Sequence, residues 1–395
     1  MISVAGSQMQ TWALLWHIRD LTDQPIALGL MGLARILPVI FFSLIAGALA
    51  DTINRRKLMF TTQTAQALVA LALGVLTLMG SINLGMIYLL TAIQSVAVAF
   101  DLPARQALVP NLVPARDLPN AFSLNSIAQQ TGSIVGPALS GLVIASLGLS
   151  AVYWINAISF IAVLVALVLM GPVSQQTRAG AKSPLSLEAI REGVRFILSQ
   201  PIILSTMVID FFATFFSSAN TLMPLYVRDV LHVGVIQYGW LSAAQSIGAI
   251  AAAVVISQFA GIKRQGPLFL ICVAFFGLAT ILFGLSRSFP LAMAALILVG
   301  ASDSVSTIIR NTIRQLQTPD SMRGRMTGVN QIFFMGGPQL GEVEAGVVAQ
   351  LFNTPIAIIS GGIGCLVALA WIIRRWPQLR SFNGDETVRE ATPAN

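Results

Sequence analysis

Charge is scarce in this chain. Asp, Glu, Lys and Arg make up 10% of its 395 residues, against about a quarter of the residues in soluble domains. Hydrophobic residues make up 55%, and they form runs that are too long and too numerous for a pair of soluble domains. The composition therefore indicates a protein embedded in a membrane.

Cysteine and histidine are also rare, with two of each. Cys272 and Cys365 both lie inside apolar runs, which argues against a disulfide framework or a metal site. His17 and His232 lie near the ends of such runs, so neither a metal cluster nor a histidine-based catalytic set can be assembled. We therefore expect a protein that is not an enzyme and that carries no metal and no cofactor.

The apolar runs predict an all-α membrane protein with twelve transmembrane helices. Each run far exceeds the length of a barrel strand and lacks the alternation of one. The expected spans are 1–18, 26–50, 58–79, 84–100, 121–149, 151–170, 201–227, 234–260, 267–285, 290–308, 326–352 and 355–373.

One six-segment unit is used twice in this chain. Residues 105–141 match residues 310–346 at an offset of 205, and residues 18–20 match residues 227–229 at an offset of 209. In a very apolar chain, such a duplication is typical of a transporter built from two pseudo-symmetric bundles with its site between them.

The duplication also bears on the first helix. Span 7 begins near residue 201, and 201 − 209 = −8, so span 1 should begin about eight residues before Met1. We therefore expect a first helix that is truncated at its N-terminus. The first residues lack a basic region and a small-residue cleavage site, so they do not form a signal peptide.

The net charge of +7 is distributed unevenly. Nineteen of the 23 Lys and Arg, Arg310 and Arg314 among them, fall in alternate loops and the C-terminal tail, whereas the opposite loops hold only Arg19, Arg228 and Arg287. This asymmetry predicts that the basic loops and the C-terminus are cytoplasmic. The positive charge thus reports topology and not a nucleic-acid partner.

We divide the chain into four parts. Residues 1–170 form an N-terminal six-helix bundle, 171–200 a cytoplasmic linker, 201–376 a C-terminal six-helix bundle and 377–395 a disordered cytoplasmic tail. In the linker, Leu187, Ile190, Val194 and Ile197 make one apolar stripe, which favours an amphipathic helix on the membrane surface. A helix that binds a partner protein is the alternative.

The loop between spans 2 and 3 carries a motif. It reads GALADTINRRK from Gly47 to Lys57 and resembles the loop signature of the major facilitator superfamily, although Thr52 and Asn54 depart from the usual Arg and Gly. The resemblance implies that Asp51 docks against the start of span 11 and helps to close the cytoplasmic side. The residues that we assign to this cytoplasmic gate are Gly47, Asp51, Arg55, Arg56, Asp101, Arg105, Asp303 and Arg310.

Span 5 places small residues on one face, with a proline among them. Gly132, Gly136, Pro137 and Gly141 resemble the span-5 signature of the proton-driven exporters in the same superfamily, and close helix packing is the simpler interpretation. The runs FDLPARQALVPNLVP and LGEVEAG resemble the exporter branch that includes the enterobactin exporters. This resemblance, which extends from about residue 7 to residue 376, implies efflux of small organic compounds across a bacterial inner membrane.

Ionisable groups at bilayer depth are costly and suggest function. Arg35 on span 2 and Glu342 on span 11 lie at similar depths, about 14 Å from one end of their spans, so we expect Arg35 to pair with Glu342 or with Glu344. Arg35 bound to carbonyls and water is the alternative. Asp210, near the middle of span 7, is our candidate for a proton-binding or cation-binding acid, with a packing role as its alternative. Asp303 is expected to form a gate ion pair with a basic loop residue, with substrate contact as the alternative.

Polar and aromatic side chains on spans 1, 4 and 7 are our candidates for the cavity wall, namely Gln8, Gln10, Gln94, Phe211, Phe215 and Asn220. A cavity of this mixed character suits amphiphilic compounds better than sugars. We therefore predict a monomeric, proton-coupled exporter of a small amphiphilic or siderophore-like compound, whose partners are its substrate, protons and the lipid bilayer. A lysophospholipid transporter of the same fold is the alternative, followed by a solute importer and a membrane sensor.

Overall fold

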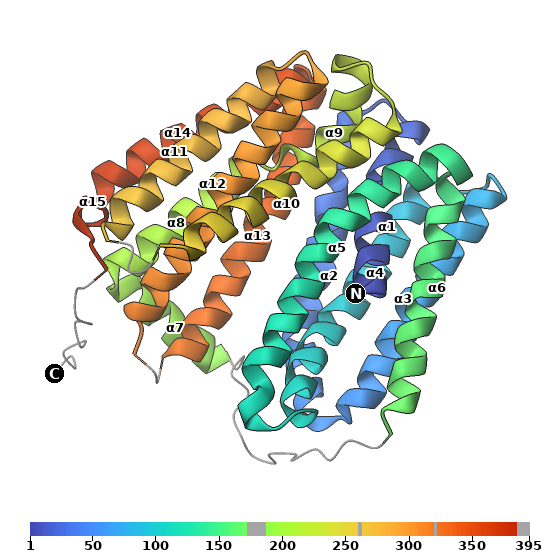
Figure 1. The fold of residues 1–395 in the computed structure, drawn as a ribbon, viewed down its shortest axis with the longest axis horizontal. Coiled ribbons are helices and arrows are strands. Elements are labelled where there is room, and N and C mark those ends of the chain that lie inside the picture. The colour runs from blue at the N-terminus through green and yellow to red at the C-terminus, as the bar shows by residue number, and fades with distance from the viewer. Residues whose placement is uncertain (172–186, 260–262, 320–321, 385–395) are drawn as a thin grey trace.

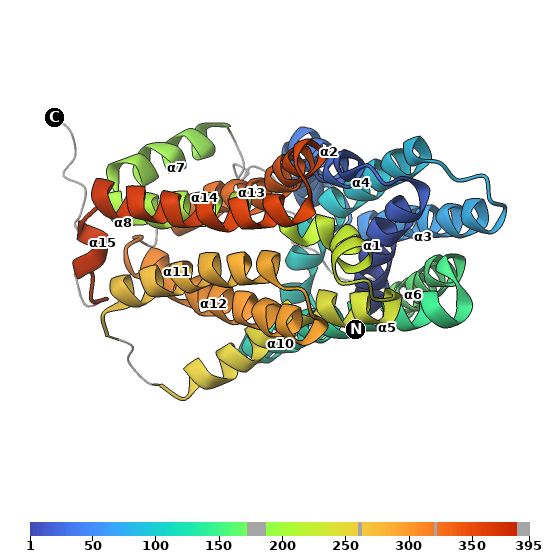
Figure 2. The same ribbon diagram turned by 90° about the horizontal axis from the view of Figure 1, so that it is seen from above.

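The computed structural model describes residues 1–171, 187–259, 263–319 and 322–384, and helices dominate these residues. Figure 1 shows two helical bundles, blue to green for the N-terminal half and yellow to red for the C-terminal half, and Figure 2 shows them side by side. The N-terminal bundle contains α1 (Ile2–Leu21), α2 (Pro25–Thr52), α3 (Arg55–Leu78), α4 (Leu84–Leu108), α5 (Leu118–Leu147) and α6 (Leu149–Leu169). The C-terminal bundle contains α8 (Pro201–Phe216), α10 (Val235–Ser257), α11 (Gln265–Leu285), α12 (Phe289–Leu316), α13 (Arg323–Leu351) and α14 (Thr354–Arg375).

Shorter elements connect or extend these helices. They are η1 (Val109–Asn111), η2 (Ala115–Asp117), α7 (Leu187–Ser199), η3 (Ala219–Leu222), α9 (Met223–Leu225), η4 (Tyr226–Val230) and α15 (Gln378–Ser381). Span 7 was expected to be one continuous helix, but it ends as α8 at Phe216 and resumes through η3, α9 and η4. The hydroxyl of Ser218 donates to the carbonyl of Thr214 at this break, where it competes with the helical backbone bonds.

The prediction of two sets of six long helical segments is confirmed, although two of the twelve are less apolar than expected. In the described residues, ten of the twelve are long and apolar enough to cross a membrane. The other two, α1 and α13, are long enough but more polar, because α1 carries Gln8, Gln10 and Arg19 and α13 carries Glu342 and Glu344. Both pack inside the assembly, against α5 and α6 for α1 and against α2 and α8 for α13.

Two helices continue beyond the apolar runs that predicted them. Spans 4 and 10 were expected to end at residues 100 and 308, but α4 reaches Leu108 and α12 reaches Leu316. Arg105, Arg310 and Arg314, which we had counted as loop residues, therefore lie on helices.

The linker and the tail are only partly described. The linker's loop, residues 172–186, lies outside the described residues. Its helix, α7, packs against the start of α13, where Glu192 Oε2 lies 2.8 Å from Arg325 Nη1. The tail was expected to be disordered from Pro377, but α15 forms there because Leu379 and Phe382 are buried in the core of the C-terminal bundle. Residues 385–395 lie outside the described part.

The two bundles meet through two crossings that the internal duplication relates. Helix α5 crosses α10, and α2 crosses α13. A Cβ atom added at Gly239 would lie 3.0 Å from the Cα of Gly141, and one added at Gly346 would lie 2.8 Å from the Cα of Gly29. Only glycines allow backbones to approach so closely, and each crossing therefore sits on a glycine pair.

Candidate transport site

Reciprocal ion pairs join the halves at one end of the interface, which we call the closed end. Arg19 at the end of α1 contacts Asp229 of η4, with 2.8 Å from Nη2 to Oδ1. Arg228 contacts Asp20 at the same distance, from Nη1 to Oδ1. Residues 19–20 and 228–229 are duplicates at the offset of 209, so the contact is two-fold symmetric. Arg228 also lies over the ring of Trp16.

Deeper in the interface, Arg35 of α2 contacts Glu342 of α13, with 3.3 Å from Nη1 to Oε1. Both side chains are mostly buried. This is the pairing expected from their depths on the two helices, and its role in transport stays a prediction. Glu344, two residues along α13, points elsewhere on the helix and is partly exposed.

A cluster of four charged side chains lies between α8 and α12. The Asp210 carboxylate contacts two guanidinium groups, with 2.7 Å from Oδ1 to Arg310 Nη1 and 3.6 Å from Oδ2 to Arg314 Nη2. The side chains of Asp210, Arg310 and Arg314 are 1%, 4% and 3% exposed. Arg310 Nη1 also lies 3.6 Å from Asp303 Oδ1. Two acids and two cations make the cluster neutral, as buried charge requires.

Arg314 is the member of this cluster that we had not singled out. It donates from Nε to the hydroxyl of Thr206 and from Nη2 to the carbonyl of Thr206, and these bonds tie α12 to α8. Its spacing was the available signal, because residues 310 and 314 lie on one face of any helix that continues past Ile308.

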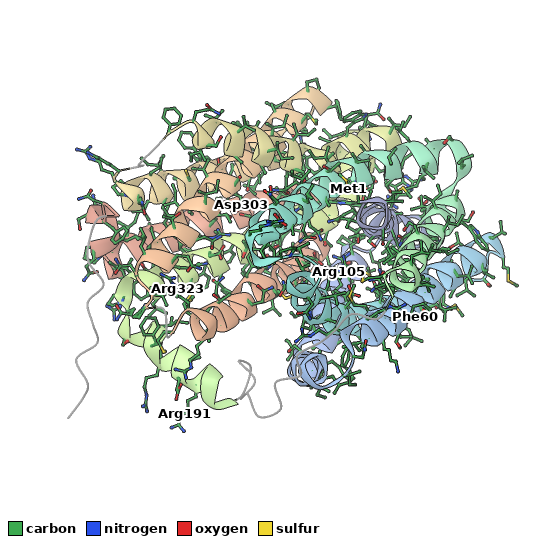
Figure 3. All side chains as sticks on the ribbon, turned by 60° about the horizontal axis from the view of Figure 1, so that its bottom comes forward. Met1, Phe60, Arg105, Arg191, Asp303 and Arg323 are labelled. Carbon is green, nitrogen blue, oxygen red and sulfur yellow. The ribbon has the colours of Figure 1, made fainter. Side chains whose placement is uncertain are left out.

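A cavity of about 260 Å³ adjoins the cluster. Its walls come from α8, the break after it, η3, α10, α11, α12 and α13, with Gln130 of α5 contributed by the other half. Asp303 lies on this wall, near the centre of the molecule in Figure 3, and 47% of its side chain is exposed. The cavity wall is otherwise made of amides, hydroxyls and apolar groups among the residues that the structure describes.

The cavity candidates from the sequence have mixed outcomes. Asn220 lines the cavity, and its amide exchanges two hydrogen bonds with Gln245. Gln10 is buried in the N-terminal bundle, where it donates to Gln94 and accepts from Asn156. Neither residue lines this cavity, and their place in a cavity wall stays a prediction.

The other three candidates, Gln8, Phe211 and Phe215, are not among the residues that line this cavity. Phe211 and Phe215 stack on each other beside α13. Gln8 lies against Gly136 where α1 meets α5.

At the end opposite to the closed one, which we call the open end, α5 has separated from its surroundings. Every residue from Phe122 to Thr131 except Ala128 is exposed, although a helix packed on one side exposes about half of its surface. Gln130, the residue of α5 that lines the cavity, belongs to this exposed stretch.

Six of the eight candidates for the gate lie at the open end. The other two, Asp303 and Arg310, belong to the charge cluster beside the cavity, where they form an ion pair with 3.6 Å from Oδ1 to Nη1; a role of this pair in the gate stays a prediction. Asp101 accepts two hydrogen bonds from Arg105, one turn along α4, and others from Thr62 and Gln63. Arg56 donates to the carbonyls of Leu167 and Val168 and so caps α6 within its own half.

The remaining gate residues surround the motif between α2 and α3. Gly47 and Asp51 lie in the last turns of α2, and Arg55 begins α3. The surroundings of Gly47 and of the Asp51 side chain lie outside the described part of the structure.

The span-5 glycines are packing positions. Cβ atoms added at Gly132 and Gly136 would meet Val4 and Gln8 of α1 at 2.5 Å, and Gly141 faces α10. The duplicated glycines of α13 repeat the arrangement, with Gly337 and Gly341 against α8 and Gly346 against α2. Pro137 lies inside α5 at the crossing with α10.

Two pseudo-symmetric six-helix bundles with a cavity between them define a membrane transporter of the major facilitator type. Solved structures share this fold. A bacterial homolog of the human lysosomal transporter Spinster, inward-facing and occupied, covers 100% of this chain and 97% of its own, with a TM-score of 0.73 and 14% identity. A bacterial homologue of the iron transporter ferroportin, inward-facing, covers 96% of each chain, with a TM-score of 0.71 and 14% identity.

The family model for transmembrane secretion effectors matches residues 1–393, and the chain belongs to that family. Similar curated proteins are the multidrug efflux pump Tap of Mycolicibacterium fortuitum, 27% identical over 88% of this chain and 86% of the pump, and the enterobactin exporter EntS of Escherichia coli O1:K1, 28% identical over 86% and 80%. The protein is therefore a multi-pass membrane transporter and not an enzyme, and neither name supports the lysophospholipid alternative.

Proposed function

We propose that this transporter exports a small organic compound by alternating access, driven by protons, as a monomer in a bacterial inner membrane with its C-terminus in the cytoplasm. The observation that carries the proposal is the asymmetry of the interface. The reciprocal ion pairs shut one end, while the exposed helix α5 and the cavity leave the other end accessible. The basic loops lie at the accessible end, and the positive-inside rule supports a cytoplasmic position for that end.

Export is favoured over import because the similar curated proteins are an efflux pump and an exporter. In an exporter, the state whose cavity is open to the cytoplasm is the one that loads the substrate. A substrate bound beside Asp303 would leave on the other side once the closed end opens and the open end shuts.

Proton coupling is best placed in the charge cluster. Arg310 lies between two carboxylates, 2.7 Å from Asp210 and 3.6 Å from Asp303. A proton on Asp210 would neutralise one of the two carboxylates that Arg310 contacts, so that Arg310 would keep only Asp303 as its charged partner. The contacts between α8 and α12 would then rearrange. Arg35, Glu342 and Glu344 are the second ionisable group of the interface, where a proton on Glu342 would release α2 from α13.

The test is substrate-stimulated proton movement in proteoliposomes, with a panel of siderophores and cationic dyes. We expect proton flux with at least one compound, lost in Asp210→Asn. The matched control is Asp117→Asn, which removes an acid at the start of α5, away from the cluster. Asp210→Asn with full pH-gradient-driven efflux would exclude Asp210 as the coupling acid, and transport without proton flux would exclude proton coupling altogether.

A further inference from the structure

Asp303 is the member of the charge cluster that the cavity reaches. Its side chain is 47% exposed, although it lies near the centre of the molecule (Figure 3), because the exposed surface faces the cavity. Its counter-ion, Arg310, is 3.6 Å away and is 4% exposed. From this geometry we infer that Asp303 binds the positive charge of the substrate, and that the site takes organic cations with apolar bodies, an inference that rests on the export function proposed above.

The two arginines of the cluster are not available to a substrate. Arg310 makes its short contact with Asp210, and Arg314 divides its donors between Asp210 and Thr206. Both guanidinium groups are buried behind these partners. An anionic substrate would have to break a buried ion pair to reach either of them, which is costly. A cation instead meets the exposed part of the Asp303 carboxylate, whose contact with Arg310 is the longer one at 3.6 Å.

The rest of the wall fits the body of such a compound. Asn220 and Gln245 satisfy each other through two hydrogen bonds, so their amides need no partner from a substrate. Phe276 and Val299 add apolar surface, and an aromatic face also favours a cation. Among the described residues of the wall, Asp303 is the only ionisable one, so it determines the sign of the charge that the site accepts.

The inference separates two classes of substrate. A carboxylate that faces an organic cation in a partly buried site attracts it electrostatically, and we expect this attraction to contribute a factor of about ten in affinity. The same carboxylate repels a compound that carries a negative charge. We therefore expect binding of a lipophilic cation and rejection of an anion of equal size.

The experiment is equilibrium binding to the purified full-length chain in detergent, with two probes of nearly the same size and shape and of opposite charge, tetraphenylphosphonium and tetraphenylborate. Binding without transport keeps the test separate from the proposed function, which proton flux tests. We expect the cation to bind, the anion to bind at least about ten times more weakly, and Asp303→Asn to lose about tenfold in affinity for the cation. Asp303→Glu, which keeps the charge, should retain most of it.

The control is Asp117→Asn. Asp117 is as exposed as Asp303, at 46%, and its counter-ion Arg116 lies 3.5 Å away, but it is far from the cavity wall at the start of α5. This variant should bind the cation as the parent chain does, and melting in detergent should show that both variants are folded. Equal or stronger binding of the anion, no measurable binding of the cation, or unchanged affinity in Asp303→Asn would each overturn the inference. In the last case Asp303 would be a structural partner of Arg310.

Discussion

The reciprocal ion pairs of the closed end can be tested with charge swaps that leave composition and net charge unchanged. Exchanging Arg19 with Asp20 turns both cross-interface pairs into like-charge contacts, because position 19 then faces Asp229 as an acid and position 20 faces Arg228 as a base. Exchanging Arg228 with Asp229 does the same from the other side. Both exchanges together restore two opposite-charge contacts with their order reversed.

The free energy that these ion pairs contribute depends on how exposed their side chains are. Arg19 is 11% exposed, while Asp20 and Arg228 are 35% and 49% exposed, and such pairs contribute about 0.2–1 kcal/mol each. Losing two pairs therefore costs the closed-end contact about 0.4–2 kcal/mol before any repulsion. At about 1.4 kcal/mol per factor of ten, each single exchange should shift the equilibrium between the two end states by roughly 2- to 30-fold toward opening.

The assay is the distance distribution between spin labels at Leu21→Cys and Ile236→Cys, two exposed positions at the closed end, in a chain whose buried Cys272 and Cys365 are replaced by Ala. Each exchange alone should increase the population with long distances, and the double exchange should reverse most of that increase. Raised ionic strength should weaken the difference, because exposed pairs are screened. Equal distributions in all four chains would refute a role of these pairs in closing the interface.

Two further predictions concern contacts inside the bundles. A Cβ atom at Gly341 would lie 2.0 Å from a backbone oxygen of α8, whereas one at Gly336 on the same helix meets nothing within 4 Å. Gly341→Ala should therefore cost about 1–3 kcal/mol of folding free energy, seen as a lower melting temperature in detergent. Gly336→Ala should preserve or raise the melting temperature. Equal melting of the two variants would contradict the packing. Arg35→Glu and Glu342→Arg should each reduce transport, and the two together should restore it; a swap without rescue would show that their 3.3 Å contact is not needed.

The sequence could predict the two bundles because hydropathy and the internal offset are local properties of the chain. Depth along two helices was also sufficient to bring Arg35 to Glu342. The burial of Arg310 and Arg314 was not predictable in this way. Hydropathy falls after Ile308, so in the sequence the last turns of this helix cannot be told from a basic loop. The helix continues to Leu316 because Asp210 and Thr206 of α8 receive both guanidinium groups, and that partnership is visible only in the folded chain.

The duplication also separates the contacts that both halves contribute to their interface from the charged residues next to the cavity. The closed-end ion pairs and the glycine crossings occur on both sides of the pseudo-two-fold axis, as expected of parts on which the two halves rock. The charge cluster is copied only in part. At the offset of 205, Arg310 corresponds to Arg105, which pairs with Asp101 in its own half. Asp303 and Arg314, however, correspond to Val98 and Val109, and at the offset of 209 Asp210 corresponds to Met1. Both halves therefore contribute equivalent contacts to the interface, while the C-terminal half alone supplies the charged residues next to the cavity.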